Sequence, residues 1–254
     1  MIDTEKARRW RYRIVAIAAV VMGVSPFAYS AKNCDANMPV SAQYTIRIHT
    51  AKTQANTVTN MGLWRSGNSV AEQYPAKKVT EIWERNHVNT IKLNRYFDAH
   101  ERGIEYAPSD IKGLRNDDDW SMKRQLIANS LLAKMTLNKK IGKGCEREEI
   151  YTLHDDTQLI TLTWLPASQL VKNYQRELNG QLTVWALTNK SSDSKMIKAF
   201  FDKYLNYQTT DYADIGDSES DPFIRKMINL GFIDHGSSGI YDAQGNGIGS
   251  SHKH

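Results

Sequence analysis

Acidic residues crowd one short stretch of the chain, between residues 211 and 221. Hard cations such as calcium take several oxygen ligands from one flexible loop, so this stretch is a candidate cation site. It is not an EF-hand, because a loop counted from Asp217 would need glycine and glutamate where the chain has Pro222 and Ile228. An acidic surface for a protein partner and a solvated loop are the alternatives. The carboxylates concerned are Asp211, Asp214, Asp217, Glu219 and Asp221, of which Asp214, Asp217 and Glu219 are the candidate metal ligands.

Histidines near the C-terminus form a second candidate metal site. His252 and His254 are two residues apart, a spacing at which two imidazoles can chelate zinc or copper. A zinc site usually needs three or four ligands, and the others are not evident in the sequence. A polar tail without metal is the alternative. A divalent cation is therefore the one cofactor that the sequence suggests, and its identity stays open.

Catalytic motifs with suitable spacing are not found in the sequence. His154, Asp155 and Asp156 are adjacent, but neighbouring residues on a turn point in different directions, which favours a solvated turn. The segment 67–69, Gly-Asn-Ser, lacks the second glycine of a nucleophile elbow, since residue 71 is Ala71. A non-catalytic role is favoured. A hydrolase or metal-dependent enzyme that uses scattered His and Asp residues is an alternative.

The chain has two cysteines, Cys34 and Cys145. In an oxidising compartment an isolated pair is most simply a disulfide, and two free thiols are the alternative. The wide spacing excludes a CxxC redox motif.

The N-terminus has the pattern of a secretory signal peptide. Basic residues between Lys6 and Arg13 precede an apolar stretch over Ile14–Val24, and Ala28-Tyr29-Ser30 supplies small residues for cleavage between Ser30 and Ala31. An uncleaved anchor is the alternative, but the apolar stretch is shorter than the roughly 20 residues that span a bilayer. We therefore expect a protein exported to a bacterial periplasm, with no permanent membrane span after cleavage.

The charge balance argues against nucleic acid as a partner. The chain holds 33 basic and 28 acidic residues, and residues 1–30 contain five of the former and two of the latter. The mature chain is thus left with 28 basic and 26 acidic residues, without the basic excess that a nucleic-acid binder needs.

Alternating apolar and polar residues predict a meander of antiparallel strands over residues 43–107. Tyr44, Ile46 and Ile48 alternate with polar residues, and further strands are expected over 57–65, 69–74, 79–85 and 90–97, with a short one around 104–106. Each strand is half polar, so one face of the sheet meets a core and the other meets water or a partner. A second β segment is expected over 149–153, 159–165 and 181–187.

Helical spacing predicts four helices. The first starts at the capping and acidic residues Asn116 to Asp119 and continues to about residue 137, and a flexible basic link is expected over 139–144. Ser168 is expected to cap a short helix that ends at Asn179-Gly180. Ser192 or Asp193 caps the next, and Ser220 or Asp221 the last.

The predicted fold class is α+β: a largely antiparallel sheet with helices on one face. We expect one domain over 31–235 and a flexible Gly/Ser/His tail over 236–254. Aromatic residues at strand positions either pack the core or line an apolar or sugar-stacking surface. They are Tyr44, Trp64, Tyr74, Trp83, Tyr106 and Trp164.

The meander, with Gly62-Leu63-Trp64-Arg65 and Gly67-Asn68-Ser69-Val70 around a turn, resembles periplasmic outer-membrane lipoprotein carriers of the LolA and LolB kind. The resemblance implies an unclosed half-barrel whose cavity, lidded by helices, holds acyl chains. Three functions follow as hypotheses. The favoured one is a non-catalytic binding or carrier protein for an apolar or lipid-like ligand. The alternatives are an accessory or assembly factor that binds a protein partner through the loop 211–221, and the enzyme named above.

Overall fold

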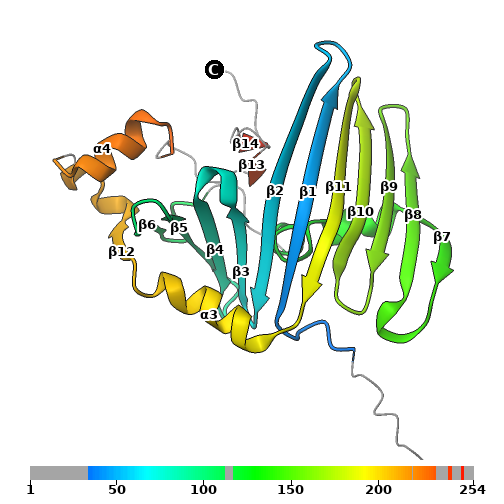
Figure 1. Cartoon of the computed structure of the whole chain (residues 1–254), viewed down its shortest axis with the longest axis horizontal. Coiled ribbons are helices and arrows are strands. Elements are labelled where there is room, and N and C mark those ends of the chain that lie inside the picture. The colour runs from blue at the N-terminus through cyan, green and yellow to red at the C-terminus, as the bar shows by residue number, and fades with distance from the viewer. Residues whose placement is uncertain (1–33, 112–116, 219, 233–239, 242–246, 249–254) are drawn as a thin grey trace, which may run out of the picture. The chain divides into compact units, whose positions relative to one another are not determined.

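A computed structural model describes residues 34–111, 117–218, 220–232, 240–241 and 247–248. The chain divides into two compact units, residues 1–32 and 33–254, and all described residues belong to the second. Its main element is a 12-stranded sheet in the order β12-β6-β5-β4-β3-β2-β1-β11-β10-β9-β8-β7 (Figure 1). The strands are β1 Val40–Thr50, β2 Ala55–Ser66, β3 Ser69–Tyr74, β4 Val79–Arg85, β5 Ile91–Phe97, β6 Arg102–Tyr106, β7 Thr136–Ile141, β8 Glu148–His154, β9 Gln158–Leu165, β10 Leu170–Leu178, β11 Gln181–Ser191 and β12 Gln208–Asp211.

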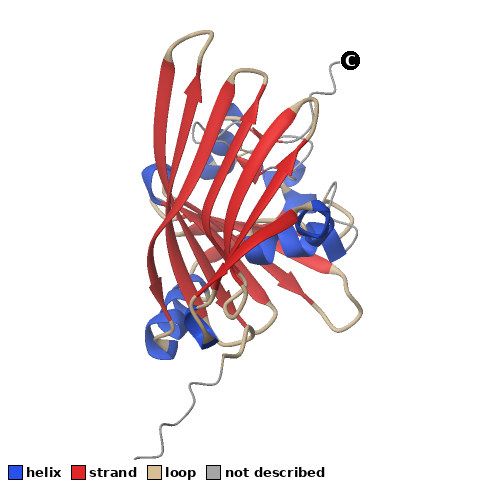
Figure 2. Ribbon diagram, turned by 90° about the vertical axis from the view of Figure 1, so that its right-hand side faces the viewer, coloured by secondary structure: helices blue, strands red, loops and turns tan. Residues whose placement is uncertain are grey.

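The helices are α1 Asp117–Gln125, α2 Asn129–Lys134, α3 Ser194–Tyr204 and α4 Pro222–Asn229. Every pair of neighbouring strands in the large sheet is antiparallel except β12 and β6, which are parallel. Figure 2 shows the short loops that join successive strands. The sheet stays open, because β12 and β7 lie at its two edges and do not pair with each other. The predicted α+β class with an unclosed sheet is confirmed.

The two faces of the sheet carry different cores. Successive side chains of a strand point to opposite faces, and on β4 Trp83 and Ile82 mark the two. The face of Trp83, called the inner face here, carries the main core, which also includes residues of α1 and α4. The face of Ile82, the outer face, is covered by α3. The sequence placed all helices on one face, including the one that became α3. In the structure α3 packs on the outer face, where Ala71, Ile82 and Tyr96 form a separate apolar strip.

The helix predicted after residue 116 is two helices. Leu126 has a φ of 64°, a left-handed conformation that ends α1, and α2 begins at Asn129. The Ser121 hydroxyl accepts a hydrogen bond from the Asn129 backbone across the break, at 2.9 Å. Of the flexible basic link expected over 139–144, residues 139–141 instead belong to β7, because Thr136–Ile141 pairs with β8 as an edge strand of the sheet.

The helix predicted after Ser168 is wrong, because Leu170–Leu178 forms β10. Tyr174 and Arg176 alternate with Asn173 and Gln175 along a strand paired on both sides. Asn179 and Gly180 have φ values of 50° and 74° and join β10 to β11. Two consecutive residues with positive φ form the tight turn of a hairpin, for which Asn-Gly is the favoured pair. The dipeptide therefore marked a hairpin and not the end of a helix.

The remaining helix caps and the disulfide agree with the sequence. The Asp193 carboxylate accepts hydrogen bonds from the backbone of Lys195 and Met196 at the start of α3. Asp221 accepts one from Phe223 at the start of α4. Cys34 and Cys145 form the predicted disulfide, which ties the segment before β1 to the segment after β7.

Several predicted segments lie outside the described residues. The signal peptide and its cleavage between Ser30 and Ala31 are among them, as is most of the tail over 236–254. Within that tail, Ile240–Tyr241 (β13) pairs with Gly247–Ile248 (β14). Among the described residues, no helix has both the length and the apolar content needed to cross a bilayer.

Candidate functional site

An apolar row of side chains crosses the inner face of the sheet from β7 to β1. Directly paired residues of neighbouring antiparallel strands project from the same face, so a chain of pairs forms a continuous line of contacts. Hydrophobic residues pair directly with one another across six strands that are neighbours in the sheet, from β7 to β1. In order, the apolar row consists of Leu137, Tyr151, Leu162, Tyr174, Trp185 and Ile46.

The apolar row is only partly covered by the rest of the protein. Leu162 is buried, whereas Tyr151, Tyr174 and Trp185 are half-buried and pack against the core. The rings of Tyr174 and Trp185 meet edge to face with centroids 6.1 Å apart. Leu137, on the edge strand, is 40% exposed. The row thus presents aromatic and aliphatic surface to solvent.

A small cavity lies beside Trp185, where the sheet meets α1. Its volume is about 20 Å³, and Met122 and Leu126 line its helix side. A space of this size holds about one water molecule. Any larger apolar ligand at this face would therefore lie along the open row and not inside this cavity.

A buried ionic row runs beside the core on the same face. The register pairs Glu72 of β3 with Glu81 of β4, and Glu81 with Arg95 of β5. Nζ of Lys123, from α1, lies 3.1 Å from Oε2 of Glu72, and the Arg95 guanidinium lies 2.8 Å from Oε1 of Glu81. All four side chains are almost wholly buried. Each of the two adjacent carboxylates thus has its own cation, as buried charges require.

The pKa of Glu72 reflects its burial and the charges of the ionic row around it. Burial raises the pKa of its carboxyl, Lys123 opposes that rise, and neighbouring Glu81 adds to it. The Tyr74 hydroxyl donates a hydrogen bond to Glu72 at 3.1 Å. Lys123 also lies over the Trp83 ring, 4.2 Å from its centroid, a cation–π contact that helps to hold α1 against the sheet.

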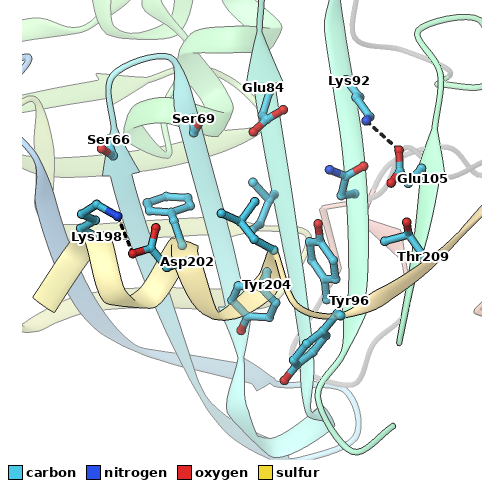
Figure 3. A pocket seen from close by; sticks show the side chains of 15 residues that line it. Ser66, Ser69, Glu84, Lys92, Tyr96, Glu105, Lys198, Asp202, Tyr204 and Thr209 are labelled. Carbon is cyan, nitrogen blue, oxygen red and sulfur yellow. Dashed lines mark hydrogen bonds and ion pairs between the residues drawn. The ribbon is translucent and has the colours of Figure 1, made fainter. Parts of the chain in front are cut away.

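A groove of about 480 Å³ lies on the outer face, between α3 and strands β2 to β6 (Figure 3). Two ion pairs line it: Lys92 with Glu105 at 2.7 Å, and Lys198 with Asp202 at 2.5 Å. Figure 3 shows Glu84 between these pairs. This α3 groove is lined by Ser66, Ser69, Ile82, Glu84, Lys92, Asn94, Tyr96, Glu105, Lys198, Phe201, Asp202, Tyr204, Leu205, Tyr207 and Thr209.

Aromatic contacts hold α3 in place above the groove. Phe200 stacks on Trp64 of β2 with ring centroids 3.9 Å apart and planes 4° apart. The Tyr204 hydroxyl lies 2.8 Å from the Thr80 hydroxyl of β4. Asp98 accepts a hydrogen bond from Lys203 at 2.6 Å. One wall of the groove is therefore fixed to the sheet at several points.

Tyr96 forms the floor of the groove. Its ring lies over Gly103 of β6, where an added Cβ would come within 2.7 Å of the ring, so glycine is needed for this close approach. Burial raises the pKa of Tyr96 to about 12, and the charges of Glu105 and Glu84 add to the rise. Both carboxylates thus place negative charge at the floor.

The predicted acidic site does not form a cluster in the described part of the chain. Asp211 accepts a hydrogen bond from Ala213, and Asp221 pairs with Arg102 at 2.8 Å besides capping α4. Asp214 and Asp217 are exposed, in separate short turns over 212–214 and 216–218. Glu219, His252 and His254 lie outside the described residues. Among described residues, no group of three His, Cys, Asp or Glu side chains is placed to hold a metal.

The histidines available to an enzyme are dispersed. His49 is on β1 beside Asn56, and His154 ends β8. His87 is exposed in the turn between β4 and β5, and His100 contacts the Phe223 ring after β5. The structure brings none of these four together. Asp155 stabilises its turn by accepting hydrogen bonds from Thr157 and Gln158, as the turn interpretation predicts.

The strand aromatics mostly pack the core. Five of the six residues proposed from the sequence are buried on the inner face, and Trp64 lies on the outer face against Phe200. Sequence reasoning missed the ionic row and the α3 groove. The sequence does contain a sign of the ionic row. Alternation places a charged residue on the same face as a core residue two positions earlier in Val70-Ala71-Glu72, Val79-Thr80-Glu81 and Leu93-Asn94-Arg95.

No protein-family profile matches the chain, and no curated protein matches it. Solved structures similar to it include PNGF-II, at 10% identity and a TM-score of 0.33, over 71% of this chain and 33% of that one. This chain thus spans about a third of the length of PNGF-II. A LolA superfamily protein from Nitrosomonas europaea is 9% identical with a TM-score of 0.31, over 61% of this chain and 86% of that one.

MucB in complex with MucA(peri) is 10% identical with a TM-score of 0.32, over 65% of this chain and 53% of that one. Likenesses of this size concern the arrangement of strands and helices only. The structures similar to this chain thus include a LolA superfamily protein, the kind of protein that its sequence resembles.

Proposed function

We propose that this chain is an exported periplasmic binding or carrier protein that holds an apolar or lipid-like ligand against the apolar row of its sheet. The leader pattern over residues 1–30 supports export, and the disulfide between Cys34 and Cys145 suits an oxidising compartment.

The observation that carries the proposal is the uncovered part of the apolar row. Tyr151, Tyr174, Trp185 and Leu137 belong to one line of paired residues and keep part of their surface in water, whereas Leu162 between them is buried. Covering apolar surface stabilises a complex by about 25 cal/mol per Å². Partly exposed apolar side chains grouped on one face of a protein therefore favour a binding surface.

The shape of this surface favours a long, flexible ligand. The row runs across six strands, and neighbouring strands lie about 4.8 Å apart. An acyl chain can extend over such a line and contact several side chains at once. A compact ligand would need an enclosed pocket, and the cavity beside Trp185 has room for little more than a water molecule.

Native mass spectrometry of protein purified from the periplasm, without detergent, tests the proposal. We expect a population whose mass exceeds that of the mature chain by one lipid-like molecule, and that loses this mass on extraction with organic solvent. Protein that carries no such molecule, and that binds no dansyl-labelled fatty acid after extraction, would show the proposal to be wrong.

A further inference from the structure

The α3 groove contains two hydrogen-bond acceptors that lack partners. Oδ1 of Asn94 is buried and accepts no hydrogen bond from any described group, although Asn94 as a whole is only 9% exposed. Glu84 makes no ion pair or hydrogen bond with another described residue, whereas the other charged groups of the groove are paired. Glu84 is exposed to water, but the buried Oδ1 of Asn94 is costly to leave without a donor, which points to a donor supplied from outside the chain.

These two acceptors are close together in the fold. Glu84 of β4 pairs with Lys92 of β5, and Ile82 pairs with Asn94, so the two acceptors occupy diagonal positions on the outer face. The groove's charged groups are three carboxylates and two ammonium groups, which leaves one negative charge without a counter-ion. The site is therefore complementary to a donor that carries positive charge.

The walls of the groove fit the rest of such a ligand. Phe201 is half-buried at the groove and offers aromatic surface, over which an ammonium or guanidinium group is attracted. Tyr96 and Tyr204, with ring centroids 4.8 Å apart, are almost wholly buried and support this wall from behind. Leu205 at the same groove is 81% exposed and offers an apolar contact next to the charged ones.

The α3 groove is longer than a single bound side chain would need. A second hollow of about 470 Å³ shares Ser69, Glu84 and Lys92 with it and extends towards Pro108. Arg85 also lines this hollow, but its charge is paired with Asp117. Two joined hollows with hydroxyls, a free carboxylate and an apolar rim suit a segment of polypeptide better than a single small cation.

We infer that the α3 groove binds a segment of a partner protein that carries a lysine or arginine beside an apolar residue. The basic group donates to Glu84 and to Oδ1 of Asn94, and the apolar residue packs on Leu205. This site lies on the face opposite to the apolar row and is independent of the proposed function.

Selection from a pool of short, capped, randomised peptides tests the inference, with the folded mature protein as bait. Wild-type protein should enrich peptides that contain Lys or Arg next to an apolar residue. Glu84→Gln removes the charge and keeps the shape, and it should lose the enrichment. Glu177→Gln is the matched control, because Glu177 is also an exposed glutamate on the outer face, on β10, outside the groove.

The best peptide is then titrated against all three proteins, beside a version in which citrulline or norleucine replaces the basic residue. Loss of a charge-assisted hydrogen bond should weaken binding roughly tenfold for Glu84→Gln and for the neutral peptide. Salt should weaken the wild-type complex. Wild-type protein that enriches no basic peptides, or equal binding by wild type and Glu84→Gln, would overturn the inference. Fatty-acid binding by Glu84→Gln should stay unchanged, which separates this test from that of the apolar row.

Discussion

Nζ of Lys123 on α1 lies 3.1 Å from Oε2 of Glu72 on β3, and both side chains are withdrawn from water on the inner face of the sheet. Glu81, which pairs with Glu72 across β3 and β4, adds a second negative charge next to it. Ionisation of Glu72 therefore changes the contact between α1 and the sheet, so the stability of the fold should vary with pH.

Glu72→Gln should alter the pH dependence of stability. The folded-state pKa of Glu72 is raised above its ordinary value of 4.5 by burial, so its stabilising contribution is complete below that value and is lost as pH rises through the folded-state pKa. The wild-type free energy of unfolding, minus that of Glu72→Gln, should thus fall as pH rises from about 4 towards neutrality. Urea unfolding at several pH values measures this. A difference that is constant, or that grows with pH, contradicts the prediction.

The sequence predicted the sheet better than the helices, for a physical reason. Most strands alternate in polarity, as Tyr44, Ile46 and Ile48 do, and such a period of two is specific to strands. The segment 170–178 was misassigned because Leu170, Val171, Tyr174 and Leu178 also fit a helical spacing. Only pairing with β9 and β11 decides between the two, and that pairing is a property of the tertiary structure.

The candidate sites were less accessible to sequence reasoning. The apolar row joins residues from six strands, and its register depends on bulges at Leu137/Lys139 and Val171/Asn173 that the sequence does not announce. The α3 groove needs α3 to pack on the outer face, over strands more than 90 residues earlier in the chain. A local cluster such as Asp211 to Asp221 can be identified without the fold, because its residues are already neighbours in the sequence.

Removing the disulfide should weaken the fold substantially. Cys34 and Cys145 are 111 residues apart, and the chain-entropy account assigns a loop of this length about 4–5 kcal/mol. The variant Cys34→Ser/Cys145→Ser should lose stability of this order in urea unfolding, and reduced wild type should match it. In the chain-entropy account, the disulfide stabilises the fold by restricting the unfolded chain. A loss below about 1 kcal/mol would contradict that account for this disulfide.

Gly103→Ala should disturb the floor of the α3 groove. The new Cβ would meet the Tyr96 ring at 2.7 Å and the Thr209 methyl at 3.1 Å, so the ring must move. We expect a loss of about 1–3 kcal/mol, typical of overpacking. Gly216→Ala is the control, because its Cβ meets nothing within 4 Å, and it should leave the stability nearly unchanged. Equal effects of the two substitutions would contradict this account of Tyr96.

Asp214→Asn/Asp217→Asn tests the acidic loop for a role in binding. Both side chains are exposed, so the double variant should keep the wild-type melting temperature without added cations. If the loop holds a divalent ion, as the sequence suggests, calcium should raise the melting temperature of wild type and not of the variant. Asp156→Asn, another exposed acid, is the control. The same response to calcium in all three proteins would identify the loop as merely solvated.

The central claim, that the apolar row binds a lipid-like ligand, is tested most directly by two matched leucines. Leu137 on the row is 40% exposed, and Leu159 on the outer face of β9 is 41% exposed. Titration with a dansyl-labelled fatty acid compares Leu137→Ser, Leu159→Ser and wild type after extraction of any bound lipid. Binding should weaken roughly fivefold for Leu137→Ser, because about 1 kcal/mol of apolar contact is lost. Leu159→Ser should bind as wild type does. Equal affinity in all three proteins, or a greater loss for Leu159→Ser, would contradict the claim.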